Sequence, residues 1–378
     1  MNKRLSIIGR GTAGCLSALH FSNRGYNIDW YHDPNTPALS VGEGADLTLP
    51  HYLNEEMNMN HEDFIKLDGH YKQGIEKINW GKKPFTHWFD SSNIAWHINA
   101  NKLQKHIIDY VGNKVNIIEK KIEHKNIDNY IIDCSGKPSD ISELNTPPIP
   151  VDKSYVVQCP WEKPRFDKTL CIAKSYGWVF LIPLQNRCSV GYLYNSKYAD
   201  IPHLNEELNS ILKEYNLTSI SSTTIDFDNY YRSENFNEKV SYNGNASFFL
   251  EPMEATSLST SILLLGWIDE FFWAYEKEYD VFSKNIFQKA NIKYKTYLEE
   301  TVDIIMLHYL IDPPVNNNFW EYANYNANEW FSMRYKTYPK INLITEKSLL
   351  NYSAWYDKSF KQNIKGLNIQ DKLNKFRW

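Results

Sequence analysis

Paired cysteines are missing from this sequence. It has five cysteines in 378 residues, and no two of them form a Cys-x-x-Cys pair. This spacing lacks the usual zinc-binding patterns, so we expect no metal site. The odd number and the scatter predict free thiols in a reducing compartment, and hence a cytoplasmic protein. The five are Cys15, Cys134, Cys159, Cys171 and Cys188.

Strong charge of one sign and long apolar runs are also missing. The net charge is −4, so no broad basic surface predicts a nucleic-acid partner. The longest apolar stretch, residues 262–268, is far too short to span a bilayer, and we expect no membrane association. A glycine-rich motif follows the first residues at once, which argues against a signal peptide.

The clearest positive feature lies at residues 5–14, where a short apolar run ends in Gly-x-Gly-x-x-Gly and a helix-like segment follows. In such a motif Gly9 allows a sharp turn, Gly11 lets a pyrophosphate approach the backbone, and Gly14 lets helix and strand pack closely. The free N–H groups and positive dipole end of the helix also attract phosphates. The sequence therefore predicts a strand, turn and helix that bind a dinucleotide.

A second strand is expected at residues 26–31, and two interpretations of its end stay open. An acidic residue is expected there to hydrogen-bond the adenosine ribose. The chain has His32 followed by Asp33, so the acid is displaced by one position. Asp33 also fits the first residue of a turn before Pro34.

The remaining patterns predict an α/β fold: a Rossmann-like core of the Gly-x-Gly-x-x-Gly type, interwoven with an antiparallel substrate sheet and followed by a helical C-terminal part. Alternating apolar and polar residues at 155–195 favour the antiparallel sheet. Residues 147–150 are a rigid proline-rich connector between the two layers. Other expected elements are a helix at 100–111, hairpin strands at 115–118 and near 122, a strand at 129–133 that ends in a glycine turn, and helices after 258.

Several separated motifs together resemble one family, the flavin-dependent halogenases of the tryptophan-halogenase type. The small size and the composition are similar to those of viral members. Most specific are Lys72 after an aromatic residue and the stretch Trp178-x-Phe180-x-Ile182-Pro183. The matching stretches occur in family order over about the first 320 residues, at 9–14, 41–44, 71–72, 133–136, 178–183, 191–192, 251–256, 308–309 and 319–320.

The resemblance implies an FAD-binding core and a two-component enzyme. A separate flavin reductase supplies reduced FAD, and oxygen and a halide ion then give hypohalous acid. Lys72 matches the lysine that activates this acid for electrophilic substitution on a small aromatic substrate. Glu254 matches the glutamate that positions the halogenating species or takes the ring proton.

The resemblance also carries over the surroundings of these two residues. Thr256 and Ser257 occupy the halide-binding turn. The substrate wall and the tunnel are assigned to His87, Phe89, Trp178, Phe180 and Pro183. The FAD-binding set is Gly9, Gly11, Thr12, Ala13, Gly14, Val41, Gly42, Glu43, Gly44 and Asn245.

The chain departs from the family pattern at several positions. Phe180 stands where the family has a second tryptophan. Ser257 stands where the halide turn usually has glycine, and this change favours bromide or iodide over chloride. Residues 1–325 are expected to form the halogenase-like module. Residues 326–378 are expected to be a C-terminal extension that is short for the family, so tryptophan is doubtful as the substrate and a more open site is expected.

Competing interpretations stay open. One is an FAD-dependent aromatic monooxygenase, which would share the fold but have no use for Lys72 together with Glu254. Another is a non-catalytic FAD-binding redox sensor. Taken alone, Lys72 fits a solvated surface lysine, and Glu254 fits a carboxylate at the start of a helix. A homo-oligomer is compatible with the sequence but not indicated by it.

Overall fold

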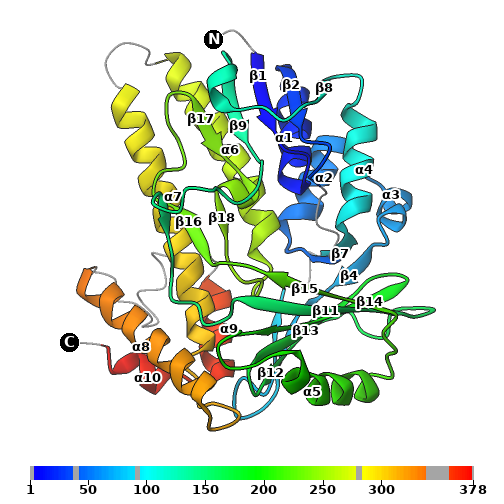
Figure 1. Ribbon diagram of the computed structural model, residues 1–378, viewed down its shortest axis with the longest axis vertical. Helices are drawn as coiled ribbons and strands as arrows, with labels where there is room; N and C mark the ends of the chain where they lie inside the picture. The colour runs from blue at the N-terminus through cyan, green and yellow to red at the C-terminus, as the bar shows by residue number, and fades with distance from the viewer. Residues whose placement is uncertain (1–3, 37–41, 90–93, 278–282, 338–356, 377–378) are drawn as a thin grey trace. The chain divides into compact units, whose positions relative to one another are not determined.

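A computed structural model describes residues 4–36, 42–89, 94–277, 283–337 and 357–376 (Figure 1). The chain forms two compact units, and each is assembled from three separate stretches. Unit 1 comprises Met1–Gly69, Ala95–Asn145 and Tyr230–Thr296. Unit 2 comprises His70–Ile94, Thr146–Asn229 and Tyr297–Trp378. The chain therefore enters each unit repeatedly, as expected for interwoven layers.

A five-stranded parallel sheet organises unit 1, in the order β17-β9-β1-β2-β8. Its strands are β1 (Arg4–Ile8), β2 (Asn27–His32), β8 (Asn116–Glu119), β9 (Tyr130–Asp133) and β17 (Val240–Tyr242). The chain adds strands outward from β1 to β2 and β8, and then returns to the other side of β1 with β9. The switch point is thus between β1 and β9, where ligands bind in open parallel sheets.

Helices and short strands complete unit 1. Helix α4 (Ala100–Val111) begins at Asn99, whose side-chain oxygen accepts hydrogen bonds from the backbone N–H groups of Asn101 and Lys102, a favourable N-cap. The other helices are α1 (Thr12–Asn23), α2 (Thr48–Met57), α3 (His61–Lys66), η1 (His124–Asn126), η2 (Gly244–Ala246) and α6 (Thr256–Lys277). The short strands are β3 (Gly42–Gly44), β7 (Ala95–Asn99), β10 (Leu144–Asn145), β16 (Tyr230–Arg232) and β18 (Phe248–Phe249).

A seven-stranded sheet organises unit 2, in the order β15-β11-β14-β13-β12-β5-β6. Neighbouring strands are antiparallel except β12 and β5, which are parallel. Apolar residues on one sheet face pack against helix α5 (Ile201–Glu214), which begins at the N-cap Asp200. The strands are β5 (Gly74–Ile78), β6 (Phe85–Trp88), β11 (Lys153–Pro160), β12 (Lys168–Lys174), β13 (Gly177–Pro183), β14 (Arg187–Tyr194) and β15 (Ser221–Asp226), and β4 (His70–Lys72) precedes β5.

Helices dominate the C-terminal part, as predicted. They are α7 (Ser283–His308), α8 (Asn318–Thr337), α9 (Asp357–Leu367) and α10 (Gln370–Asn374). Within the described part of the chain, none of the helices combines the length and the apolar character needed to cross a bilayer.

The expected hairpin at residues 115–122 is wrong. Residues 116–119 form β8, which pairs in parallel with β2, and no strand forms around Ile122. The apolar run at this position serves as an edge strand of the parallel sheet, and sequence spacing alone does not distinguish that from a hairpin. The predicted antiparallel sheet, the second strand and the helix at 100–111 are confirmed.

Candidate functional site

Two glycines of the motif are required by the local geometry of unit 1. Gly9 has φ +99°, and a Cβ atom added there would lie 2.2 Å from the carbonyl oxygen of Cys134. A Cβ atom on Gly14 would lie 2.1 Å from the carbonyl oxygen of Gly9. Trp30 fixes that same oxygen by donating a hydrogen bond of 2.7 Å from Nε1. The loop is therefore closely packed against β9 and α1.

The remaining glycine of the motif, Gly11, lies beside open space. Gly11 is the N-cap of α1, and a Cβ atom added there would meet no described atom within 4 Å. The first turn of α1 carries no acidic side chain of its own that would compete with an anion for its N–H groups and dipole. Thr12 is oriented by Gln104, whose Nε2 donates to the Thr12 hydroxyl at 3.0 Å. This arrangement fits the pyrophosphate of a dinucleotide.

Residue Asn245 lies in a segment that packs against the same loop. The preceding Gly244 has φ +57°, and a Cβ atom added to it would lie 2.5 Å from Cβ of Ala13. The backbone carbonyl of Asn245 accepts a 2.6 Å hydrogen bond from the hydroxyl of Tyr230. The structure thus brings together Ala13 and the 244–246 turn, although they are far apart in sequence.

Strand β9, next to the loop, ends in Asp133, whose side chain is held in its ionised form. Asp133 accepts hydrogen bonds from His124 Nε2 at 2.7 Å and from the backbone N–H of Ser135 at 2.8 Å. Burial alone would raise the pKa of Asp133, but these hydrogen bonds outweigh it and hold the pKa below its ordinary value. The carboxylate therefore stays ionised and fixes the turn at the switch point.

The strap expected near the flavin ring is described only in part. Val41 lies outside the described residues. Gly42, Glu43 and Gly44 form β3, which pairs antiparallel with β7.

The turn before α6 holds Glu254 and the expected halide residues. Glu254 is 4% exposed, and Ala255 after it has φ +56°, a left-handed conformation that is strained for alanine. Thr256 is 1% exposed, and its Oγ1 forms no hydrogen bond with any described residue. A buried hydroxyl at a helix N-terminus can donate to an anion. Ser257 is half-buried at the next position.

In unit 2 the structure brings together Lys72, His87 and Phe89. Lys72 is fully buried, and its Nζ lies 5.3 Å from the ring centroid of Phe89. The imidazole of His87 packs edge-on against Phe89 with centroids 5.6 Å apart, and its Nε2 lies 3.0 Å from the hydroxyl of Ser359 on α9. The interpretation of Lys72 as a solvated surface lysine is therefore wrong.

The tryptophan-containing stretch forms β13, in which Trp178 and Phe180 share one face. Both are buried, and their rings are 6.3 Å apart in an edge-to-face arrangement. The Phe180 ring covers Gly191 so closely that a Cβ atom there would lie 2.2 Å from Cζ. Pro183 is buried at the end of the strand. This face is opposite the one that packs on α5.

Sequence reasoning missed two polar pairs. Lys77 is fully buried in β5, and its Nζ lies 2.8 Å from Nε2 of His308, whose Nδ1 lies 2.9 Å from the Ile304 carbonyl oxygen. Arg10 NH1 lies 3.1 Å from Nε2 of His32 at the end of β2. The sequence did contain a sign of the Arg10–His32 pair, because His32 stands at the end of the second strand, where the dinucleotide-binding motif expects an acidic residue.

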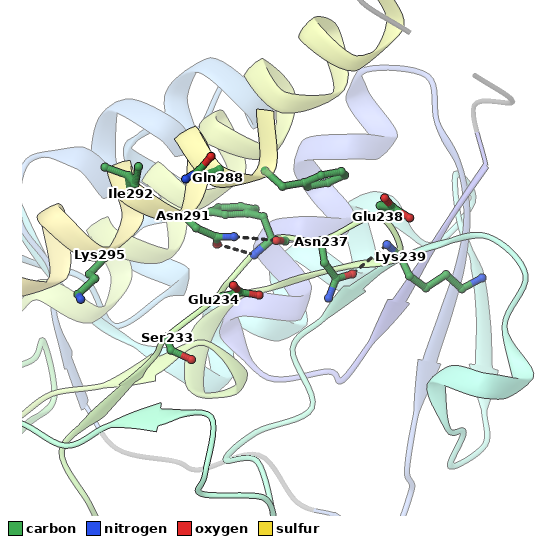
Figure 2. Close-up of a pocket in the computed structure, with 11 residues that line it drawn as sticks. Ser233, Glu234, Asn237, Glu238, Lys239, Gln288, Asn291, Ile292 and Lys295 are labelled. Atoms are coloured by element: carbon green, nitrogen blue, oxygen red, sulfur yellow. Dashed lines mark hydrogen bonds between the residues drawn. The ribbon is translucent and has the colours of Figure 1, made fainter. Parts of the chain in front are cut away.

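A separate open groove of about 670 Å³ lies on unit 1 between the loop 233–239 and α7 (Figure 2). Asn291 holds the loop by accepting hydrogen bonds from the backbone N–H groups of Asn235 and Phe236. The loop leads into Val240, the first residue of β17, so the groove lies at the amino ends of the parallel strands. Among the predicted site residues that the structure describes, none lines it.

The thiols do not form a metal centre in the described structure. None of the five cysteines, all of which lie within the described residues, forms a disulfide, and burial raises the pKa of Cys15 to about 12. Among the residues whose placement is described, no group of three or more His, Cys, Asp or Glu side chains is arranged to hold a metal ion.

Comparison with known proteins places these features in a family. The model of the family described as tryptophan halogenase matches residues 4–128 and 90–372. The chain belongs to the tryptophan halogenase family. Members of this family are flavin-dependent halogenases, so the chain is an enzyme of this class. The match extends to residue 372, well beyond the first 320 residues on which the resemblance was based.

Individual family members are distant in sequence. Tryptophan 7-halogenase RebH from Lentzea aerocolonigenes is 20% identical over 432 residues, which cover 84% of this chain and 78% of RebH. The tryptophan halogenase from Shewanella frigidimarina NCIMB 400 has a TM-score of 0.78 at 18% identity, covering 99% of this chain and 92% of its own. Xcc4156, a flavin-dependent halogenase from Xanthomonas campestris, has the same score and identity, with 99% and 93% covered. These structures share the fold, including the FAD-binding Rossmann-like core.

Proposed function

We propose that this chain halogenates an electron-rich aromatic compound, using a halide ion, oxygen and reduced FAD delivered by a separate flavin reductase. Family membership supports the reaction class. The observation that carries the proposal is Lys72, which is fully buried with its ammonium beside the face of Phe89. Burying an ammonium costs free energy, so such a lysine is rarely without a structural or chemical role.

The residues that would hold FAD fit its pyrophosphate. Gly11 leaves space, and the N-terminus of α1 offers N–H groups at that space. The same cofactor is assigned to Gly9, Thr12, Ala13, Gly14 and Asn245, and the strap 41–44 is assigned to the flavin ring. When bound, reduced FAD and oxygen supply the oxidising power that converts halide into hypohalous acid.

In the proposed chemistry Lys72 acts on that acid. Its ammonium donates a hydrogen bond to the hypohalous oxygen, which polarises the O–X bond. The aromatic π electrons attack the halogen, so the C–X bond forms while the O–X bond breaks, and the oxygen leaves as water with a proton from Lys72. Glu254 takes the proton lost from the ring carbon. The net reaction converts arene and hypohalous acid into haloarene and water.

Five aromatic or rigid residues would shape the path to Lys72. Trp178 and Phe180 supply bulk on one face of β13, so they would keep the cofactor and substrate regions apart. Pro183 ends that strand, and His87 and Phe89 would form a wall for an aromatic substrate. The organic substrate is proposed as a class only.

The halide preference is proposed from the start of α6. The buried Thr256 hydroxyl, together with the helix N-terminus, can bind an anion. Ser257 adds bulk and a hydroxyl where the family usually has glycine. Chloride is the most strongly hydrated of the three halides and the hardest to oxidise, so bromide or iodide should be used in preference. Competition between equal concentrations of halides, with products separated by mass, measures this; a clear preference for chloride would contradict it.

The central test uses the purified chain with a flavin reductase, NADH, FAD and a panel of electron-rich arenes. Product masses should show a halogen in place of hydrogen, with the bromine isotope pair when bromide is present. No such product should form without halide. A product heavier by one oxygen, formed equally without halide, would instead indicate an aromatic monooxygenase. Absence of both products across the panel, despite FAD binding, would favour a redox sensor.

A further inference from the structure

The second strand of unit 1 ends without the acid that normally recognises the ribose. The last residue of β2 is His32, which is 6% exposed. Asp33 follows the strand, and its Oδ1 accepts a 2.9 Å hydrogen bond from the backbone N–H of Asn35. The Asp33 carboxylate thus closes a turn, as the second of the two sequence interpretations held.

A guanidinium lies at this position instead. Arg10 is the first variable residue of the glycine motif, and its NH1 lies 3.1 Å from Nε2 of His32. The loop and strand are joined next to this contact, because the N–H of Gly9 donates to the carbonyl of Tyr31 at 2.8 Å. Arg10 is exposed, whereas the imidazole that contacts it is buried. His32 is therefore the fixed partner and Arg10 the one that faces outward.

The charges around the imidazole favour its neutral form. Burial and the neighbouring Arg10 lower the pKa of His32, while Glu119, whose Oε1 lies 3.7 Å away, and Asp33 raise it to a smaller extent. Neutral Nε2 accepts a hydrogen bond from the guanidinium. Since arginine has five N–H donors, the other donors remain for a ligand.

We propose that Arg10, positioned by His32, recognises the adenosine half of the dinucleotide in place of the usual ribose-binding carboxylate. This inference rests on the proposed function only in requiring that the glycine motif binds FAD. A guanidinium donates hydrogen bonds to phosphate and ribose oxygens, whereas a carboxylate can only accept them and repels additional phosphate. The site should therefore tolerate, and prefer, an adenosine that carries a 2′-phosphate, a group that arginine accommodates in related motifs.

The first measurement is the Kd of FAD for the full chain, from quenching of flavin fluorescence, and it needs no turnover. Arg10→Met should raise the Kd by about tenfold, because a charge-assisted contact is lost. The matched control is Arg4→Met, which removes an exposed arginine from the other end of the neighbouring strand, where it pairs with Asp29. That variant should keep the wild-type Kd.

The second measurement separates specific recognition of the 2′-phosphate by Arg10 from a general effect of the protein's positive charge. Adenosine 2′,5′-bisphosphate and 5′-AMP differ only in the 2′-phosphate, and both are used to displace FAD. Wild type and Arg4→Met should bind the bisphosphate more tightly, by about tenfold. Arg10→Met should lose this preference.

The role of His32 as a positioning residue is tested by replacement and by pH. His32→Leu should weaken FAD binding, and His32→Gln should restore it because the amide oxygen accepts from Arg10. In wild type, affinity should stay constant near pH 6.5, the ordinary pKa of histidine, and fall only at lower pH, because burial and Arg10 lower the pKa of His32 and its charged form repels Arg10. His32→Gln should not show this fall.

The outcomes are decisive in either direction. If Arg10→Met and Arg4→Met bind FAD equally well, or if the bisphosphate binds no more tightly than AMP, Arg10 does not recognise the adenosine and the inference is overturned. If wild type does not bind FAD at all, the proposed function itself fails. The two failures are therefore distinguishable.

Discussion

The two units carry functional residues of opposite kinds. In unit 1 the important features are backbone features: Gly9 and Gly14 allow close approach, and Gly11 leaves space at a helix N-terminus. In unit 2 they are charged side chains inside a protein core, since Lys72 and Lys77 are both fully buried. A phosphate can be bound by N–H groups alone, whereas activating an oxidant requires a movable proton.

Within unit 2 the two lysines differ in their partners. Lys77 lies at hydrogen-bond distance from His308, whose other nitrogen is engaged by a backbone carbonyl. The ammonium of Lys72 lies beside the ring of Phe89, whose face attracts a cation. Burial alone therefore does not mark a catalytic lysine. What distinguishes Lys72 is its match to the lysine of the family motif.

The largest expected effect is a difference in halogenating activity between variants of Lys72 and of Lys77. Lys72→Met should lower halogenated product by roughly 10²–10⁴-fold, because the proton donor is lost. Lys72→Arg should fail similarly, since a guanidinium is bulkier and keeps its proton. Lys77→Met should leave product within about an order of magnitude of wild type. The measurement is product per oxygen consumed; equal yields from wild type and Lys72→Met would remove Lys72 from the mechanism.

The next effect tests the glycines of unit 1. Gly14→Ala places a methyl group 2.1 Å from a backbone oxygen and should lower the free energy of unfolding by about 2–3 kcal/mol. Gly11→Ala is the matched control, because its methyl meets no described atom within 4 Å. It should keep the stability but weaken FAD binding. Urea unfolding and FAD titration measure the two quantities, and a stable Gly14→Ala would contradict the packing argument.

A third effect measures the buried pair in unit 2. Lys77→Met leaves the His308 acceptor without this donor, and His308→Leu leaves the ammonium without this acceptor. Each should destabilise the protein, and the double variant should cost less than their sum. A double-mutant cycle should give a coupling of about 1–3 kcal/mol. Additive free energies of unfolding would show that the pair contributes no mutual stabilisation.

The smallest effect is a pH dependence in unit 1. Burial would raise the pKa of Glu56, but the nearby imidazole of His20 and the hydrogen bonds from Asn23 and Arg24 outweigh it and lower the pKa to about 2. The stabilisation is therefore present above about pH 4.5 and is lost as the pH falls toward 2. We expect a loss of order 1 kcal/mol, since Arg24 is partly solvated. Glu56→Gln should remove this dependence; an unchanged acid titration curve would reject it.

How much the sequence predicts depends on whether a feature is local. The glycine motif is local, so strand, turn and helix were predicted within a few residues. The hairpin near residue 120 was wrong because parallel pairing joins β8 to β2, nearly ninety positions away at Asp29 and Asn116. The tryptophan stretch was recognised as a motif, but the close cover of Phe180 over Gly191 depends on strand register.

Among the charged residues, the sequence indicated Lys72 only through a family resemblance, and taken by itself it looked like a surface lysine. Its burial follows from the fold around β4, and no local pattern encodes it. Lys77 was not noticed, because its partner His308 is 231 positions away. The domain division at residue 325, the resemblance to viral members and the roles of the site residues stay predictions.

The sequence by itself determined the features whose physical cause lies within a few neighbouring residues. These are the tight turn at Gly9, the helix start at Gly11, the N-caps and the alternation of the antiparallel strands. Only the tertiary structure decided which side chains lose water and which partners they meet: Lys72 beside Phe89, Lys77 with His308, and His32 with Arg10. Backbone conformation is set by local sterics and hydrogen bonding, whereas burial and pairing depend on segments that the chain brings together only on folding.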